Sequence, residues 1–73
     1  MDSIGKRAAY AIRGRCVQER TRLFRELGKL DIPYTNFNSW EGGKNAPNAY
    51  YLQKLALAGY DVFWILTGEK HER

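Results

Sequence analysis

Apolar residues recur at intervals of three and four through most of the chain, which predicts helices rather than strands. In the first thirty residues, this spacing predicts one helix over about 3–14, which Ser3 is able to cap, and a second over about 19–29. The apolar stripes are Ile4, Ala8, Ala11 and Ile12 on the first helix, and Leu23, Phe24, Leu27 and Leu30 on the second. Both helices are therefore expected to be amphipathic, and the second to expose its arginines.

A short amphipathic segment follows. Phe37 and Trp40 are three residues apart, so a helix places both side chains on one side. Pro33 has the fixed φ suited to a first helical residue, and the glycine pair 42–43 is expected to end the helix. The pattern predicts a third helix over 33–41, joined to the second by a short turn.

Two more helices are predicted in the second half of the chain. Either Asn48 or the Ala-Pro pair 46–47 begins the fourth, whose apolar face holds Tyr51, Leu52, Leu55 and Ala56, and Gly59 ends it. Asp61 is a good N-cap for a last short helix, VFWILT, which Gly68 ends. The near-continuous apolar character of VFWILT predicts that more than one of its sides is covered, with a second subunit as one candidate cover. Phe37, Trp40, Leu55, Ile65 and Leu66 are expected in the core.

Length and composition limit the fold. The 73 residues, 44% hydrophobic and 27% charged, predict one globular all-α domain over 1–69, a compact bundle of about five short helices, with a frayed tail over 70–73. Cys16 is the only cysteine, so no intrachain disulfide can form, and it is expected to be a small buried hydrophobe. No apolar run approaches the roughly 20 residues of a membrane span, and the N-terminus lacks a signal-peptide apolar region. A cytoplasmic protein is expected.

Positive charge is concentrated in the first half of the chain. The net charge is +4, but residues 1–30 carry eight Lys/Arg against three Asp/Glu, whereas residues 31–73 carry four against five. The cations that define a basic face on the first two helices are Arg13, Arg15, Arg20, Arg22, Arg25 and Lys29. Such a face attracts polyanions, although an ordinary solvated helix surface explains many runs of this kind.

The third predicted helix has unusual polar residues. Besides its two apolar positions, it carries small hydrogen-bonding side chains without charge, namely Tyr34, Thr35, Asn36, Asn38 and Ser39. Uncharged donors and acceptors suit a surface that meets base edges in a DNA major groove. The composition indicates a recognition helix.

Two stretches resemble the lambda-repressor-like helix-turn-helix family, in particular the DNA-binding domains of phage repressors. LDIPYTNFNSWEGGK is similar to the family's turn, recognition helix and W-E-x-G-K exit, and AGYDVFWILTGE to its closing G-V-D-x-x-W-L-L-T-G-E helix. The closing motif is the more specific, because an Asp-capped helix ending in Leu-Thr-Gly-Glu is rarely assembled by chance. The resemblance covers residues 20–69 and implies a sequence-specific transcriptional regulator, a phage or prophage repressor.

The resemblance also implies roles for individual residues. Base contacts fall on Tyr34, Thr35 and Ser39, flanked by Asn36 and Asn38, and phosphate contacts on Arg20, Arg22, Lys44 and Asn45. Asn36 or Asn38 suits adenine N6 and N7, while the hydroxyls of Thr35 and Ser39 offer either a donor or an acceptor. The implied partner is double-stranded DNA with a near-palindromic operator, bound by a homodimer whose candidate interface is Tyr60, Phe63 and Trp64.

The chain departs from the family pattern in three respects. Asp31 stands where the family usually has a turn glycine, and aspartate tolerates a left-handed backbone less readily than glycine does. Leu27 replaces a residue that is normally small, so the packing or crossing angle of the second and third helices is expected to differ. The family's polar Gln near the start of the second helix is not evident, which leaves the arginines as the expected anchors.

Other functions compete with DNA binding. A helical protein-interaction module, such as an antirepressor or an antitoxin-like protein, would keep the fold without specific DNA binding, and Tyr50, Tyr60 and Phe63 are open as partner contacts. Tyr34, Asn36 and Lys44 are also open to interpretation as ordinary surface residues. An enzyme is not expected, because no carboxylate pair, metal-ligand spacing or phosphate-binding glycine loop is present. No metal, cofactor or small-molecule substrate is expected, and the sequence leaves open whether the chain is a complete regulator or an excised domain.

Overall fold

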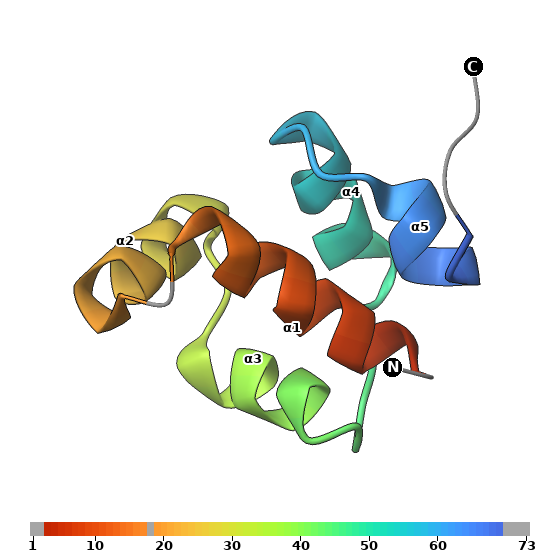
Figure 1. The fold of residues 1–73 in the computed structure, drawn as a ribbon, viewed down its shortest axis with the longest axis horizontal. Helices are drawn as coiled ribbons and strands as arrows, with labels where there is room; N and C mark the ends of the chain where they lie inside the picture. The colour runs from red at the N-terminus through yellow and green to blue at the C-terminus, as the bar shows by residue number, and fades with distance from the viewer. Residues whose placement is uncertain (1–2, 18, 70–73) are drawn as a thin grey trace.

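The computed structural model describes residues 3–17 and 19–69 (Figure 1). This part of the chain contains five α-helices, joined by turns and loops, and no strand. The helices are α1 (Ile4–Arg15), α2 (Arg20–Leu30), α3 (Tyr34–Glu41), α4 (Ala49–Leu57) and α5 (Val62–Thr67). The predicted all-α bundle is confirmed. Within the described ranges, no helix is long and apolar enough to cross a membrane. The predicted frayed tail, 70–73, lies outside them.

Three helices begin at the polar residues that the sequence predicts. The side chains of Ser3, Asn48 and Asp61 each accept a hydrogen bond from the backbone N–H three residues on, at 3.0, 3.1 and 3.0 Å. These bonds satisfy donors that the first turn of a helix otherwise leaves unpaired. For α4, the cap identifies Asn48 rather than the pair 46–47 as the start.

The starts of α2 and α3 differ slightly from the prediction. Glu19 precedes α2 as its N-cap, and Pro33 precedes α3 with an extended backbone at ψ 143° instead of forming its first helical residue. The Pro33 carbonyl accepts hydrogen bonds from the N–H groups of Asn36 and Phe37 at 3.0 and 3.1 Å. Proline therefore serves α3 as an acceptor just outside the helix.

The turn between α2 and α3 depends on a left-handed residue. Asp31 has φ 58° and ψ 42°, so the residue in the glycine position adopts the backbone that the turn requires. The N–H of Asp31 donates to the Gly28 carbonyl at 3.2 Å, and that of Ile32 to the Leu27 carbonyl at 2.9 Å. This pair of bonds ends α2 as a Schellman motif and buries Ile32.

Helix α1 lies at the centre of the bundle, with α3 packed on one side and α5 on another (Figure 1). The core contains Ala8, Ala9, Ile12, Cys16, Leu23, Leu27, Leu30, Ile32, Phe37, Trp40, Leu55, Tyr60 and Ile65. Cys16 is buried as predicted, and burial raises the pKa of its thiol.

Two apolar residues are more exposed than the sequence predicts: Phe24, placed on the apolar stripe of the second helix, and Leu66, expected in the core. Phe24 is 47% exposed and Leu66 43% exposed. The Phe24 ring packs beside the Tyr34 ring, which is also exposed, with the two centroids 5.2 Å apart. Among the residues of α5, Ile65 is fully buried and Val62 and Trp64 pack partly against the core, whereas Phe63 and Leu66 are exposed in the single chain.

A buried arginine holds α5 against α1. Arg7 is 8% exposed, and its Nε and Nη2 donate to the carbonyls of Ile65 and Leu66 at 2.8 and 3.2 Å. These carbonyls lie near the C-terminal end of α5, where a helix lacks internal donors and favours positive charge. Arg7 therefore both caps α5 and fixes its position.

The other side of α1 approaches the end of α3 very closely. A Cβ atom placed on Gly5 would lie 2.1 Å from the Asn45 carbonyl oxygen and 3.0 Å from that of Trp40. Only a residue without a side chain permits this contact between backbones. Gly5 thus sets the distance between α1 and the loop that follows α3.

Candidate nucleic-acid interface

Helix α3 has one fully buried side and one polar side. Phe37 and Trp40, at 0% and 2% exposure, anchor the helix on the core as predicted. At about 100° per residue, Thr35, Asn38 and Ser39 point away from that anchor. Thr35 and Asn38 are exposed, and Ser39 is half-buried. We call these three residues the outward face of α3.

Tyr34 and Asn36 lie on the two flanks of the outward face. Tyr34 is 45% exposed, and its ring packs between those of Phe24 and Phe37, with centroids 5.2 and 6.2 Å away. Asn36 is half-buried, and its Oδ1 accepts a long hydrogen bond from the Thr35 hydroxyl at 3.5 Å. The five predicted base-contact residues therefore form one continuous surface, with three at its centre and two at its edges.

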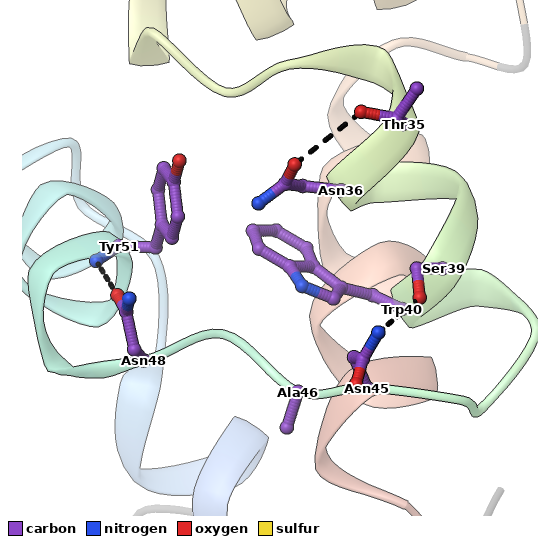
Figure 2. Close-up of a pocket in the computed structure, with 8 residues that line it drawn as sticks. All are labelled: Thr35, Asn36, Ser39, Trp40, Asn45, Ala46, Asn48 and Tyr51. Carbon is purple, nitrogen blue, oxygen red and sulfur yellow. Dashed lines mark hydrogen bonds between the residues drawn. The ribbon is translucent and has the colours of Figure 1, made fainter.

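An open pocket borders this surface on the Asn36 side. Figure 2 shows it between α3, the α3–α4 loop and α4, with Asn36 pointing toward Tyr51 across the edge of the Trp40 ring. Its volume is about 380 Å³, and its lining has no charged side chain: Thr35, Asn36, Ser39, Trp40, Asn45, Ala46, Asn48 and Tyr51. Trp40 and Tyr51 meet edge to face at 5.5 Å. The sequence predicts Asn48 as a possible helix start and Tyr51 as part of an apolar face, but it does not predict either of them at this pocket.

The loop after α3 folds back on the outward face. Gly43 takes φ 78°, and the N–H groups of Lys44 and Asn45 then point to the Ser39 carbonyl, at 3.0 and 3.5 Å. The Asn45 side chain donates from Nδ2 to the Ser39 hydroxyl oxygen at 2.6 Å. Lys44 is exposed and lines a second hollow with Thr35, Asn38 and Ser39. The structure therefore brings the two predicted loop residues to the predicted base-contact residues.

The predicted basic face divides into two groups. Arg13 turns toward α3, where it forms a bidentate ion pair with Glu41 and stacks on the Phe37 ring. Hydrogen bonding to Glu41 raises the pKa of Arg13. Arg15 turns the other way, donates to the Ala58 carbonyl at 2.8 Å, and stacks on Tyr60. Arg13 and Arg15 are thus occupied within the fold.

The other four cations of the predicted basic face, Arg20, Arg22, Arg25 and Lys29, are exposed on α2. Arg20 and Arg22 lie at its start, as predicted, and Arg22 pairs with Glu19 at 3.1 Å. A further cation, Lys6 of α1, is exposed and lies against Gly43 in the α3–α4 loop. No local signal indicates Lys6, because the loop that it accompanies is far along the chain.

The three candidate dimer residues occupy different environments. Tyr60 is buried, and its hydroxyl donates to Glu26 Oε2 at 2.6 Å. Burial, followed by this hydrogen bond, raises the pKa of the Tyr60 hydroxyl above its ordinary value. The ring is therefore a core element and not a surface for a partner. Trp64 is half-buried with its ring 6.0 Å from that of Tyr10, whereas Phe63 is 44% exposed.

No metal site is found in the part of the chain that the structure describes, since no three His, Cys, Asp or Glu side chains are grouped there. Comparison with protein-family models gives no match, and comparisons with curated proteins and with solved structures also give none. The chemistry of this surface is therefore what indicates a function.

Proposed function

We propose that the chain is a sequence-specific double-stranded DNA-binding regulator of transcription, of the phage-repressor kind, which inserts α3 into the major groove. One observation carries this proposal: α3 buries Phe37 and Trp40, and its outward face, Thr35, Asn38 and Ser39, carries only uncharged hydrogen-bonding side chains. An ordinary solvated helix surface is usually charged. In this proposal α2, the Asp31 turn and α3 form the helix-turn-helix.

The side chains of the outward face match the chemistry of base edges. Asn38 is exposed near the middle of the helix, where an amide can pair with adenine N6 and N7. Thr35 adds a hydroxyl and a methyl group one turn earlier, and the methyl group suits contact with the thymine methyl. Asn36 and Tyr34 contact the walls of the groove from the two flanks.

In this proposal, phosphate contacts come from four exposed cations. Arg20 and Arg22 lie at the start of α2, and Lys44 and Lys6 lie at the α3–α4 loop. Cations that bind the phosphates around a recognition helix set its orientation in the groove and supply the salt-dependent part of the affinity.

The protein is proposed to act as a homodimer through α5. Phe63 and Leu66 are exposed on this short helix, and Leu57, at the end of α4, is exposed as well. Two copies would place their α3 helices about 34 Å apart, one turn of duplex, on a near-palindromic operator.

Selection from a pool of random-sequence duplexes tests the proposal directly. The protein should enrich a near-palindromic sequence, and fluorescence anisotropy should then show tighter binding to that sequence than to scrambled DNA, with affinity falling steeply as salt increases. Replacing Asn38 with alanine should weaken the preference by about tenfold. A pool that stays random, with no binding at low salt, would exclude the proposal.

Replacing Lys44 with alanine is expected to weaken binding to every DNA sequence alike. One lost phosphate contact should reduce the slope of log affinity against log salt by about 1, because one fewer counterion is released. Anisotropy titrations at four salt concentrations measure this slope. Lys29→Ala is the matched control, because Lys29 is an exposed cation in the last turn of α2 and is not among the proposed phosphate contacts. Equal slopes for the two variants would contradict the placement of Lys44 at the DNA.

A second candidate function is a helical protein-interaction module. The exposed apolar side chains of α5 and the end of α4 favour it, because an exposed apolar patch often marks a protein contact. A partner bound through such a patch would be captured with little dependence on salt, in contrast to DNA.

A further inference from the structure

The hydroxyl of Ser39 has a partner that limits how it can contact a base. A serine hydroxyl has one hydrogen to donate and two lone pairs to accept. The Asn45 Nδ2 group lies 2.6 Å from Ser39 Oγ and donates to it, as Figure 2 shows. One lone pair of Ser39 is therefore occupied. Among the described residues, no acceptor is found for the Ser39 hydroxyl hydrogen.

We propose that Asn45 is a positioning residue that fixes Ser39 as a hydrogen-bond donor toward DNA, so that the base facing Ser39 presents an acceptor. This inference rests on the proposed function. In the major groove, purines present N7, guanine also O6, and thymine O4, whereas cytosine presents only the N4 donor. Asn45 therefore discriminates against cytosine at that position without contacting the base.

The position of Asn45 is fixed from two sides. Its N–H and that of Lys44 are directed at the Ser39 carbonyl, so the loop is tied to the same residue that its side chain contacts. In addition, the Asn45 carbonyl oxygen lies only 2.1 Å from the position that a Cβ of residue 5 would take, so α1 packs directly against the backbone of Asn45. A side chain that starts from a fixed backbone loses less conformational entropy when it forms its hydrogen bond.

The side-chain amide of Asn45 also makes the hydrogen-bonding role of Ser39 different from that of Thr35. Among residues 3–17 and 19–69, the one hydrogen bond found for the Thr35 hydroxyl is the 3.5 Å contact with Asn36, which is too long to fix its direction. The Thr35 hydroxyl can therefore either donate to a base or accept from it, whereas the Ser39 hydroxyl is left to donate. The two hydroxyls of the outward face are therefore expected to differ in how strictly each specifies a base.

An aspartate in place of Asn45 reverses the polarity of this contact. A carboxylate only accepts, so it takes the Ser39 hydrogen and leaves the Ser39 lone pairs toward the base. Selection from random duplexes with Asn45→Asp should then change the preference at the Ser39-dependent position toward cytosine or adenine, whose amino groups donate, by about tenfold relative to the wild-type protein. The Ser39→Ala variant identifies that position, since its preference there should disappear.

Two controls separate positioning from charge. Gln53→Glu adds the same charge at an exposed position of α4 that lines neither hollow of the interface, and it should leave the base preference unchanged. In a Ser39→Ala background, Asn45→Asp should no longer alter the preference, because the residue through which it acts is missing.

The outcomes distinguish this inference from the proposed function. If Asn45→Asp weakens binding to all sequences equally and keeps the wild-type preference, Asn45 does not orient Ser39, although specific DNA binding stands. If the wild-type protein enriches no sequence, the proposed function itself fails. Without DNA, the side-chain amide signals of Asn45 in a nitrogen–proton NMR spectrum should shift when Ser39 becomes alanine, and unchanged signals would overturn the inference.

Discussion

Replacing Gly5 with alanine is expected to lower the free energy of unfolding by roughly 3 kcal/mol, at the upper end of the cost of overpacking. The new methyl group would stand 2.1 Å from the Asn45 carbonyl oxygen, so the α3–α4 loop or α1 itself must move. Helix propensity acts in the opposite direction, since alanine favours a helix interior over glycine by about 1 kcal/mol. The steric term is larger and decides the sign. Urea unfolding followed by tryptophan fluorescence measures the change.

Gly14→Ala is the matched control for this experiment. Gly14 lies in the same helix, but a Cβ there meets no atom within 4 Å. Only propensity then acts, and a gain of about 0.5 to 1 kcal/mol is expected. If both variants were stabilised, the close approach of α1 to the loop would be incorrect. Because the loop carries Asn45, Gly5→Ala should also weaken any base preference that depends on Ser39.

Replacing Arg7 with methionine is expected to cost roughly 2 to 4 kcal/mol of the free energy of unfolding. Methionine fills much of the space of the arginine stem but leaves the Ile65 and Leu66 carbonyls without their charged donors. Arg7→Lys should recover only part of the loss, because an ammonium group lacks the planar fork that contacts both carbonyls. Denaturant unfolding of the wild-type protein, Arg7→Lys and Arg7→Met should give free energies of unfolding that decrease in that order.

The exposed Arg20 is the control for the loss of a charge. Arg20→Met removes the same charge from the surface and should change the free energy of unfolding by less than about 0.5 kcal/mol. A similar loss for Arg7→Met and Arg20→Met would show that net charge, and not the contact with α5, explains the effect.

The sequence predicts those parts of the fold that depend on neighbouring residues. The caps Ser3 and Asp61 bond to N–H groups three residues away, and Asp31 needs only its own backbone to form the turn. Helical spacing also identifies Phe37 and Trp40 as buried. Each of these features is determined within about one turn of helix, so a local pattern is sufficient.

Periodicity fails where burial depends on what packs outside the element. Phe24 and Leu66 have the right spacing for a core position, but no helix of the described chain covers their sides. Conversely, Arg7 and Gly5 carry no local signal of importance, because their partners Ile65 and Asn45 lie 58 and 40 residues away in the sequence. A single sequence does not reveal contacts over that separation.

In the candidate site, too, the sequence predicts the features that depend on one helix and misses those that depend on distant parts of the chain. The polar composition of α3 predicts which residues form its outward face, since that follows from one helix. The bond between Asn45 and Ser39 depends on how the loop turns at Gly43, and the occupation of Arg13 and Arg15 depends on two other helices. The sequence therefore predicts the residues of the surface better than their hydrogen-bonding states.

The separation of the two sides of α3 has a consequence for how the protein evolves. Phe37 and Trp40 maintain the core, whereas Thr35 and Asn38 have no described contact with it. Under the proposed function, substitutions at Thr35 and Asn38 would change the preferred operator with little effect on folding. Ser39 differs, because its hydroxyl is paired with Asn45. If the proposed function holds, we expect the residues at positions 39 and 45 to vary together among relatives of this chain, while those at 35 and 38 vary independently and most rapidly as operators diverge.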